Sequence, residues 1–196
     1  MLFLLGVLGA LAAFAFWCLL IYNRLVQLRN RIPNAWAQID VQLKRRHDLI
    51  PNLVEVASRY LKHEQETLRA VTAARGQAQG LLEAVRLQSA SAAAVTQLMA
   101  GETALMGQLG RLMAVAEAYP ELKADKQMRE LFEEIVSTEN RVGFARQAYN
   151  DAVLDLNNAV QQFPAVLIAR MTGFTPAAPL ESTTSEAERA APQLRF

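Results

Sequence analysis

The residues that could support catalysis or bind a metal are few and poorly spaced for either task. The chain holds two histidines, His47 and His63, and a single cysteine, Cys18. Carboxylate-bridged metals in helical bundles need Glu-x-x-His motifs, and neither histidine follows a glutamate by three residues. The run KHEQE begins like a zinc-protease motif but has Glu66 near the place of the second histidine ligand. The sequence also lacks a phosphate loop, a nucleophile elbow and a dinucleotide fingerprint. We therefore expect no enzyme activity, no catalytic residue, no metal site and no cofactor.

Charged and amide side chains concentrate instead in two stretches, QIDVQLKRRHDLIPN and STENRVGFARQAYND. One interpretation is that they are solvated helix-surface charges with a few hydrogen bonds between helices. A sharper one is a polar network between helices or subunits that fixes their register. The candidate network residues are Asp40, Arg45, Arg46, Asp48, Glu139, Asn140, Arg141, Arg146 and Asn150. We expect His47 to be a hydrogen-bonded structural residue rather than a ligand.

The stretch Met1–Tyr22 carries no charged side chain and predicts a transmembrane anchor. As a helix it would be roughly 33 Å long, enough to cross a hydrocarbon core of about 30 Å. Aromatic and basic residues gather at its end, as is typical of a membrane–water interface. The residues expected at that interface are Trp17, Tyr22, Arg24, Arg29 and Arg31. Because the basic residues follow the span, the positive-inside rule places the N-terminus outside and the rest of the chain in the cytoplasm.

Three other interpretations of this stretch fit less well. A secretory signal peptide would have a basic n-region, a shorter apolar core and a small-x-small cleavage site. A lipoprotein cysteine at Cys18 would need small residues where Phe16 and Trp17 stand. A buried helix of a soluble protein is disfavoured by so long an uncharged run. The anchor interpretation therefore predicts a single-pass membrane protein.

The overall charge indicates no nucleic-acid partner, because the formal net charge is only +1. The basic residues that do cluster follow the apolar stretch, where anionic lipid is the simpler partner. A single cysteine excludes an intramolecular disulfide framework.

Apolar residues at spacings of three and four predict long amphipathic helices after the anchor, and no segment has the pattern of a strand. Pro33 should end or bend the first helix. Pro51 should kink the second helix without ending it, because the apolar stripe resumes in phase. The expected helices run from Asn34 to a point between Gly80 and Ala90, from about Ser91 to Ala118, and from about Lys126 to Phe163, with a short final helix in FPAVLIARM. The 3.5-residue period of the third of these is typical of bundles and coiled coils.

The expected fold class is all-α, with an N-terminal transmembrane helix followed by an antiparallel up-and-down bundle of three or four long helices. The expected organisation is an anchor over 1–22, a basic juxtamembrane helix over 23–33, the bundle over 34–174 and a disordered tail over 175–196. The tail is rich in Pro, Ala, Ser, Thr and Glu and cannot bury enough surface to fold alone. Its end, APQLRF, is either frayed or a docking motif in which Leu194 and Phe196 share one side of an extended segment after Pro192.

Several runs make the chain resemble the LemA family of bacterial membrane proteins over nearly its whole length. They are YNRLVQLRNRIPNAWAQIDVQLKRRHDLIPNLVE, AVAEAYPELKA and STENRVGFARQAYNDAVLDLN, followed by the FP of QQFP, the GF of TGF and the closing APQLRF. The resemblance implies a single N-terminal anchor, a short exterior N-terminus and a cytoplasmic helical bundle. It implies no reaction, cofactor or catalytic residue. The region from Gly76 to Gly110 matches least.

These features predict a membrane-anchored scaffold or assembly protein at the cytoplasmic face of a bacterial inner membrane. It would act through protein–protein contacts or as a homo-oligomer, with the lipid bilayer as one partner and an unidentified protein as a candidate partner for the tail. One alternative is a metal-dependent or other enzyme that uses the polar residues of the bundle. Another is a membrane-remodelling protein that binds anionic lipid through its basic juxtamembrane region.

Overall fold

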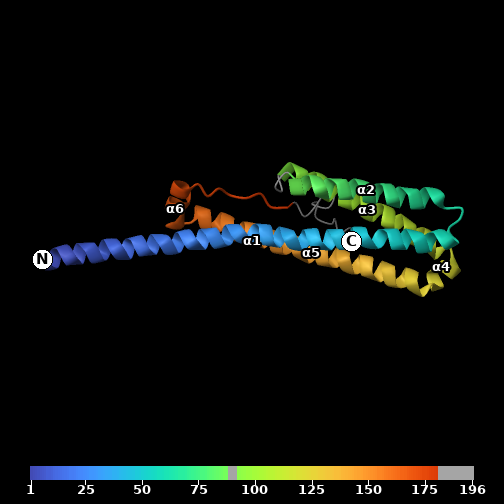
Figure 1. Cartoon of the computed structure of the whole chain (residues 1–196), viewed down its shortest axis with the longest axis horizontal. Coiled ribbons are helices and arrows are strands. Elements are labelled where there is room, and N and C mark those ends of the chain that lie inside the picture. Colours follow the sequence, from blue (N-terminus) through green and yellow to red (C-terminus); the bar gives the residue numbers. More distant parts are fainter. Residues whose placement is uncertain (88–91, 181–196) are drawn as a thin grey trace, which may run out of the picture. The chain divides into compact units, whose positions relative to one another are not determined.

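The computed structural model describes residues 1–87 and 92–180. The helices, in chain order, are α1 (Leu2–Tyr60), α2 (Gln65–Leu87), α3 (Ala92–Glu117), α4 (Pro120–Ala124), α5 (Lys126–Gln161) and α6 (Ala165–Thr172) (Figure 1). The described residues contain no strand, so the predicted all-α class is confirmed. The predicted docking residues Pro192, Leu194 and Phe196 lie outside the part of the chain that the structure describes.

The chain divides into two compact units. The first, named the anchor unit below, contains residues 1–38 and 145–179. The second, named the bundle unit, contains residues 39–144 and, among the described residues, Leu180. Both α1 and α5 contribute residues to each unit.

Helix α1 corrects the prediction that Pro33 could end the first helix, because it continues through both Pro33 and Pro51 to Tyr60. A proline inside a helix leaves the carbonyl four residues earlier without its backbone donor. At Pro33 that carbonyl belongs to Arg29, and both residues are exposed, so solvent can replace the lost hydrogen bond. The residues around Pro51 are helical, as predicted.

A second correction concerns the long helix that was expected to continue to residues 80–90. It ends at Tyr60, and a short turn leads to α2 at Gln65. In this turn the buried Leu61 donates its amide to the carbonyl of Ala57 at 2.9 Å, and Glu64 donates to the carbonyl of Leu61 at 3.2 Å. The turn contains no glycine or proline, so local composition carried no signal for the break.

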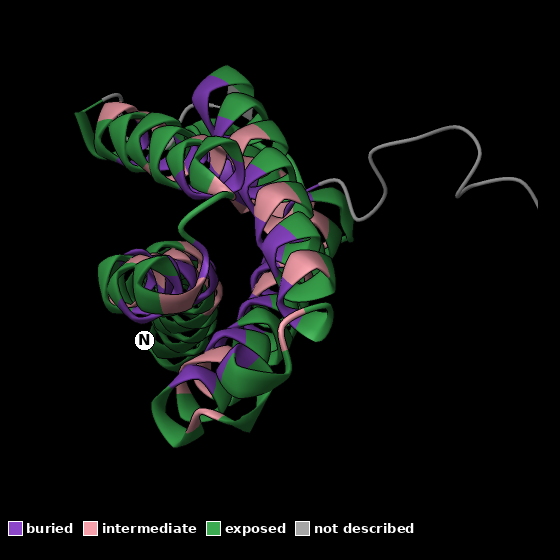
Figure 2. Ribbon diagram, turned by 90° about the vertical axis from the view of Figure 1, so that its right-hand side faces the viewer, coloured by how far each residue is buried: buried purple, intermediate pink, exposed green. Residues whose placement is uncertain are grey.

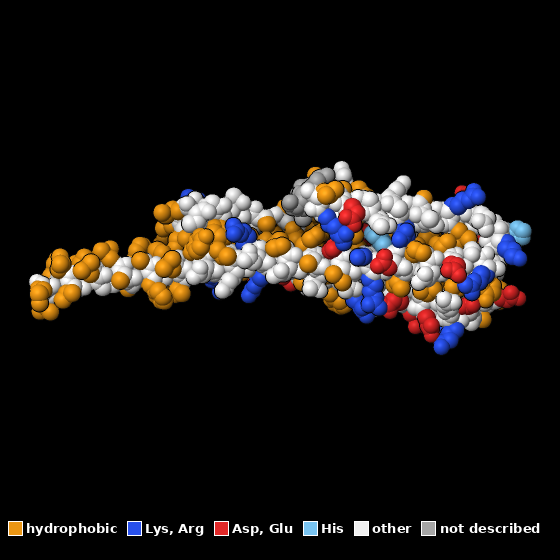
Figure 3. All heavy atoms as spheres, viewed as in Figure 1, with side chains coloured by type: hydrophobic (Ala, Val, Ile, Leu, Met, Phe, Trp, Pro, Cys, Tyr) orange, Lys and Arg blue, Asp and Glu red, His pale blue; other side chains and the backbone are white. Residues whose placement is uncertain are grey.

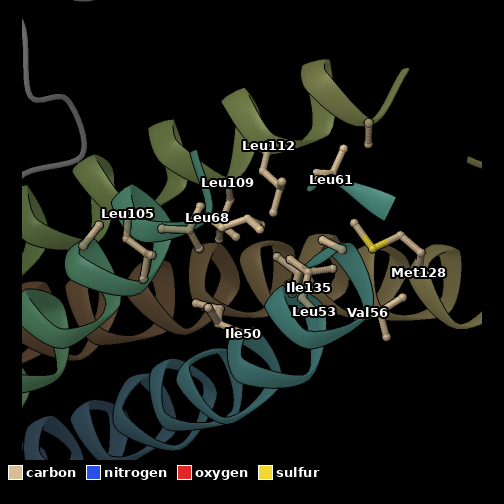
Figure 4. Packing of buried hydrophobic residues seen from close by; sticks show 14 of the residues in the cluster. Ile50, Leu53, Val56, Leu61, Leu68, Leu105, Leu109, Leu112, Met128 and Ile135 are labelled. Atoms are coloured by element: carbon tan, nitrogen blue, oxygen red, sulfur yellow. The ribbon is translucent and has the colours of Figure 1, made fainter. Parts of the chain in front are cut away.

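The bundle unit is an antiparallel arrangement in which successive long helices run in alternating directions (Figure 1). Buried residues follow one side of each helix, as their spacing predicted (Figure 2). Side chains from α1, α2, α3 and α5 point toward one another in its core (Figure 4). The labelled core residues are Ile50, Leu53, Val56, Leu61, Leu68, Leu105, Leu109, Leu112, Met128 and Ile135.

The anchor unit begins with the apolar part of α1, whose side chains are exposed (Figure 3). This helix is long and apolar enough to cross a membrane, with a mean hydropathy of 2.5 in a window in which no residue is buried. The core of this unit contains Leu25, Leu28, Leu156, Val160, Ala169 and Phe174. Helix α6 ends at Thr172 and is followed by Gly173, whose φ of 76° lets the chain turn so that the Phe174 amide donates to the Ala169 carbonyl at 2.9 Å. Helix α5 ends at Gln161 rather than Phe163, and Phe163 is exposed.

Asp125 caps the start of α5, and its hydrogen bonds predict that the stability of the bundle unit depends on pH. Its Oδ1 accepts the Met128 amide at 2.9 Å, and its Oδ2 accepts the Tyr60 hydroxyl at 2.8 Å. These hydrogen bonds to the charged form lower the pKa of Asp125, while the bond to Asp125 raises the pKa of Tyr60. A lowered pKa contributes stability above the unfolded-state value, and that stability is lost as the pH falls through the folded-state value. We expect Asp125→Asn to melt below wild type at neutral pH, with the gap closing as the pH falls below about 4.

Melting of the full chain in detergent, followed by circular dichroism against pH, measures this effect. Asp48→Asn is the matched control because Asp48 is exposed. A gap between Asp125→Asn and wild type that stays constant down to the acid limit would contradict the assignment.

Candidate functional site

Among the described residues, the most deeply buried charged side chains are those of Arg46, His47 and Glu102, and they lie in one cluster of the bundle unit. Arg46 and His47 come from α1, Glu102 from α3 and Glu139 from α5. Arg46 is 1% exposed, His47 2% and Glu102 5%. Desolvating a charge is costly unless it is paired and hydrogen-bonded, so the geometry of these partners decides whether the bundle unit is stable.

Glu102 is the centre of the cluster because both of its oxygens bind residues of α1. Its Oε2 accepts from Arg46 Nη1 at 2.9 Å, and its Oε1 lies 2.7 Å from His47 Nε2. An ionised carboxylate only accepts hydrogen bonds, so His47 carries a hydrogen on Nε2. Arg46 uses Nη2 to bind Glu139 as well. Three helices of the bundle unit are therefore joined through the guanidinium of Arg46 and the two carboxylates of Glu102 and Glu139.

Helical spacing explains why these charges are buried. Arg46 lies between Leu43 and Ile50 on the buried face of α1, and Glu102 lies between Leu98 and Leu105 on that of α3. Residues three and four apart share one face of a helix, so both charges project toward the core. The cluster thus interrupts two apolar faces.

Helix α2 is linked to this cluster through a backbone carbonyl that Pro51 leaves without a donor. Pro51 has no amide to donate to the carbonyl of His47, four residues earlier. The Nε of Arg75 on α2 donates to that carbonyl at 2.7 Å instead. A side chain of α2 therefore replaces the backbone bond that proline removes. Through Arg75, all four long helices of the bundle unit contribute to one connected set of polar contacts.

The other residues predicted to form the polar network lie in several different places in the structure. Asp40 accepts two hydrogen bonds from Arg86, at 3.1 and 2.9 Å, and these raise the pKa of the Arg86 guanidinium. Arg45 pairs with Glu134 at 2.7 Å. These pairs are partly exposed, and such surface pairs contribute about 0–1 kcal/mol each. Asp48, Asn140 and Arg141 are exposed in the bundle unit, whereas Arg146 and Asn150 are partly buried in the anchor unit.

Sequence reasoning missed Glu102 and Arg75. The buried Thr138 lies in the apolar repeat of α5, and its hydroxyl donates to the Ile135 carbonyl at 2.7 Å. For Glu102 a usable signal existed, because it is a lone carboxylate in an otherwise apolar helical stripe. Arg75 carried no comparable signal, since its partner is a backbone carbonyl distant in the sequence.

A second feature of the bundle unit is an apolar groove between α3, α4 and the start of α5, with a volume of about 540 Å³. Met113, Ala116, Leu122, Met128, Phe132 and Val136 form its walls. Glu117, Lys123, Arg129 and Glu133 supply charges of both signs around it. Met113 and Val136 are 40% and 46% exposed, so apolar surface stays open to solvent here. A groove of this kind can bind an apolar side chain of a partner.

The predicted membrane-interface residues lie in the anchor unit. The rings of Tyr22 and Phe174 meet edge to face with centroids 6.0 Å apart, and the Arg29 guanidinium lies 4.9 Å from the centroid of the Phe174 ring. Arg31 pairs with Asp155 at 3.5 Å. Trp17 and Arg24 line a pocket described below.

No group of three or more His, Cys, Asp or Glu side chains is placed to hold a metal ion within residues 1–87 and 92–180. His63 is exposed, and His47 donates to a carboxylate that Arg46 also binds. The arrangement of these described residues cross-links helices and presents an apolar groove.

Comparisons with known proteins agree with the helical and membrane-associated character of the chain. The sequence profile of the LemA family matches residues 35–196. The chain is similar to magnetosome protein MamQ 2 of Paramagnetospirillum magneticum, with 26% identity over 180 residues. It is also similar to magnetosome protein MamQ of Magnetospirillum gryphiswaldense, with 26% identity over 181 residues. Each match covers 84% of this chain but only 66% of the relative, just under two thirds of its length.

Proposed function

The chain belongs to the LemA family and is a membrane-associated helical protein, and we propose that it is an assembly scaffold in which copies of the chain bind one another through the apolar groove of the bundle unit. In this proposal α1 anchors the chain in a bacterial inner membrane with the bundle unit in the cytoplasm. No catalytic step is assigned to any residue.

The observation that carries the proposal is the groove itself. Its volume of about 540 Å³ is in the range of sites that bind a ligand or a few side chains. Its walls are contributed by three helices of the bundle unit, so the core that stabilises these helices also preforms the groove. A rigid preformed groove lowers the ordering cost of binding.

The proposed occupant is the segment Pro192–Phe196 of a second copy. Leu194 and Phe196 supply two apolar side chains, and Arg195 between them can pair with Glu117 or Glu133 beside the groove. Burying the two apolar side chains would contribute about 1.5–3 kcal/mol each before ordering costs, which supports only a weak contact. Anchoring many copies in one membrane raises their effective concentration, so weak contacts suffice for assembly.

Energy transfer between donor- and acceptor-labelled full chains, reconstituted together in vesicles, measures this self-association. Val136→Glu places a charge on the wall of the groove and should lower the transfer severalfold. Phe144→Glu is the matched control, because Phe144 is an exposed apolar residue of α5 in the same unit but does not line the groove. Deleting residues 192–196 should lower the transfer as much as Val136→Glu does.

Three results would count against the proposal in different ways. Wild-type chains that show no transfer above the level of random mixing would refute self-association. Equal effects of Val136→Glu and Phe144→Glu would refute the groove as the interface. An effect of Val136→Glu without any effect of the deletion would refute the tail as the occupant.

A further inference from the structure

Three large apolar side chains around α6 are unusually exposed. Phe163, just before α6, is 80% exposed, Leu167 is 53% exposed and Met171 is 86% exposed. Leu167 and Met171 are four residues apart and therefore lie on one face of α6. Exposed apolar groups that cluster in this way mark an interaction surface.

The other face of α6 fixes this helix beside α1. Ala169 and Ile168 belong to the core cluster that contains Leu25 and Leu28 of α1. Directly after α6, the Phe174 ring packs against the Tyr22 ring, with centroids 6.0 Å apart. All of these residues belong to the anchor unit. Helix α6 is therefore held at the part of α1 that follows the apolar stretch.

The position of Tyr22 identifies what covers the exposed face. Tyr22 and Trp17 are the aromatic residues at the end of the apolar stretch, where such rings favour the membrane–water boundary. A helix held against Tyr22 is held at that boundary too. We propose that α6 lies on the surface of the bilayer that α1 crosses, with Phe163, Leu167 and Met171 inserted at the junction of headgroups and acyl chains.

The basic residues near α6 are also consistent with contact between α6 and the bilayer surface. Arg24 and Arg170 are exposed and suit anionic lipid headgroups. A pocket of about 490 Å³ beside this region is lined by Trp17, Arg24, Asn158, Gln162 and Phe163, among others. Its aromatic side chains and its polar groups, which include amides, the Arg24 guanidinium and the Asp155 carboxylate, match the change from acyl chain to headgroup. An amphipathic helix with apolar side chains on one face and basic residues nearby is the usual form of an interfacial contact.

This contact goes beyond the proposed assembly through the groove, because it involves other residues and needs no second copy. It requires only that α1 is inserted in a bilayer. Flotation of the reconstituted chain with vesicles reports that insertion separately.

Depth-dependent quenching tests the contact in the full chain. In a Cys18→Ala background, Met171→Cys carries an environment-sensitive fluorophore, and the vesicles contain lipids with a spin label high on the acyl chain. Leu154→Cys is the matched control, since Leu154 is 58% exposed in the same unit. Its neighbour Asp155 pairs with Arg31, which lies beyond Tyr22 by about 13 Å of helix.

We expect the label at residue 171 to emit at shorter wavelength than the label at residue 154 and to be quenched severalfold more. A Phe163→Ser, Leu167→Ser variant should reduce the quenching at residue 171 while the chain still floats with the vesicles. Equal quenching at residues 171 and 154 in floated vesicles would overturn the inference and leave the assembly proposal intact. Failure of the chain to float would overturn this inference together with the anchor.

Discussion

Glu102→Ala should destabilise the bundle unit by about 3–5 kcal/mol, the usual result of removing one partner from a buried ion pair. The alanine leaves His47 without its acceptor and leaves Arg46 with Glu139 as its remaining charged partner. Glu139 is half exposed at its side chain and cannot replace a carboxylate that lies inside the core. A loss of this size is a large share of the stability of a domain of ordinary size.

Chemical denaturation of the full chain in detergent, followed by circular dichroism, measures the loss. Glu83→Ala is the matched control because Glu83 pairs with Arg86 at the surface, and it should cost less than about 1 kcal/mol. If Glu102→Ala costs no more than Glu83→Ala, the cluster does not hold the helices together.

A double-mutant cycle between Arg46→Met and Glu102→Leu measures the interaction energy of the two side chains apart from their contacts with other residues. The double variant should recover much of the stability that each single variant loses, because apolar residues of similar volume can replace a buried ion pair at little cost. Strict additivity of the two single losses would instead show that Arg46 and Glu102 do not interact across the core.

The orientation of the anchor should produce an all-or-none result. A reporter enzyme that is active only outside the cytoplasm, fused after Phe196, should be silent, and a cytoplasmic reporter at the same place should be active. The reason is that Arg24, Arg29 and Arg31 lie within the short distance after the span over which positive charge sets orientation. The opposite pair of reporter activities would show that the proposed orientation is wrong.

A charge-exchange variant tests the cause of that orientation. Replacing Arg24, Arg29 and Arg31 with glutamine, together with three lysines inserted before the span, should invert the chain. The basic run at Lys44–Arg46 lies too far from the span to oppose the change, since the rule covers about 15–20 residues from its end. A variant that keeps the wild-type orientation would show that residues other than these arginines set it.

The local sequence pattern was sufficient to predict the elements whose structure depends mainly on residues close together in the sequence. The uncharged stretch Met1–Tyr22 predicted a transmembrane helix, and the observed helix α1 is long and apolar enough to cross a membrane. The apolar spacing after Lys126 predicted α5 to within a few residues of its end at Gln161. Asp125 caps that helix because its short side-chain acceptor meets the free amides of the first turn. Each of these outcomes depends on contacts within one helix or with solvent.

Packing between distant segments set the features that the local pattern could not predict. The turn after Tyr60 has no breaking residue, but it lets Leu68 and Val71 pack in the same core as Leu53 and Val56. Arg75 reaches the carbonyl that Pro51 leaves free only because α2 folds back along α1. Glu102 and Arg46 are far apart in the sequence, and their charges are tolerated inside the core because folding brings them within 2.9 Å of each other. The energy of such a contact depends on both partners and on their desolvation. It therefore cannot be predicted from the sequence around either residue alone.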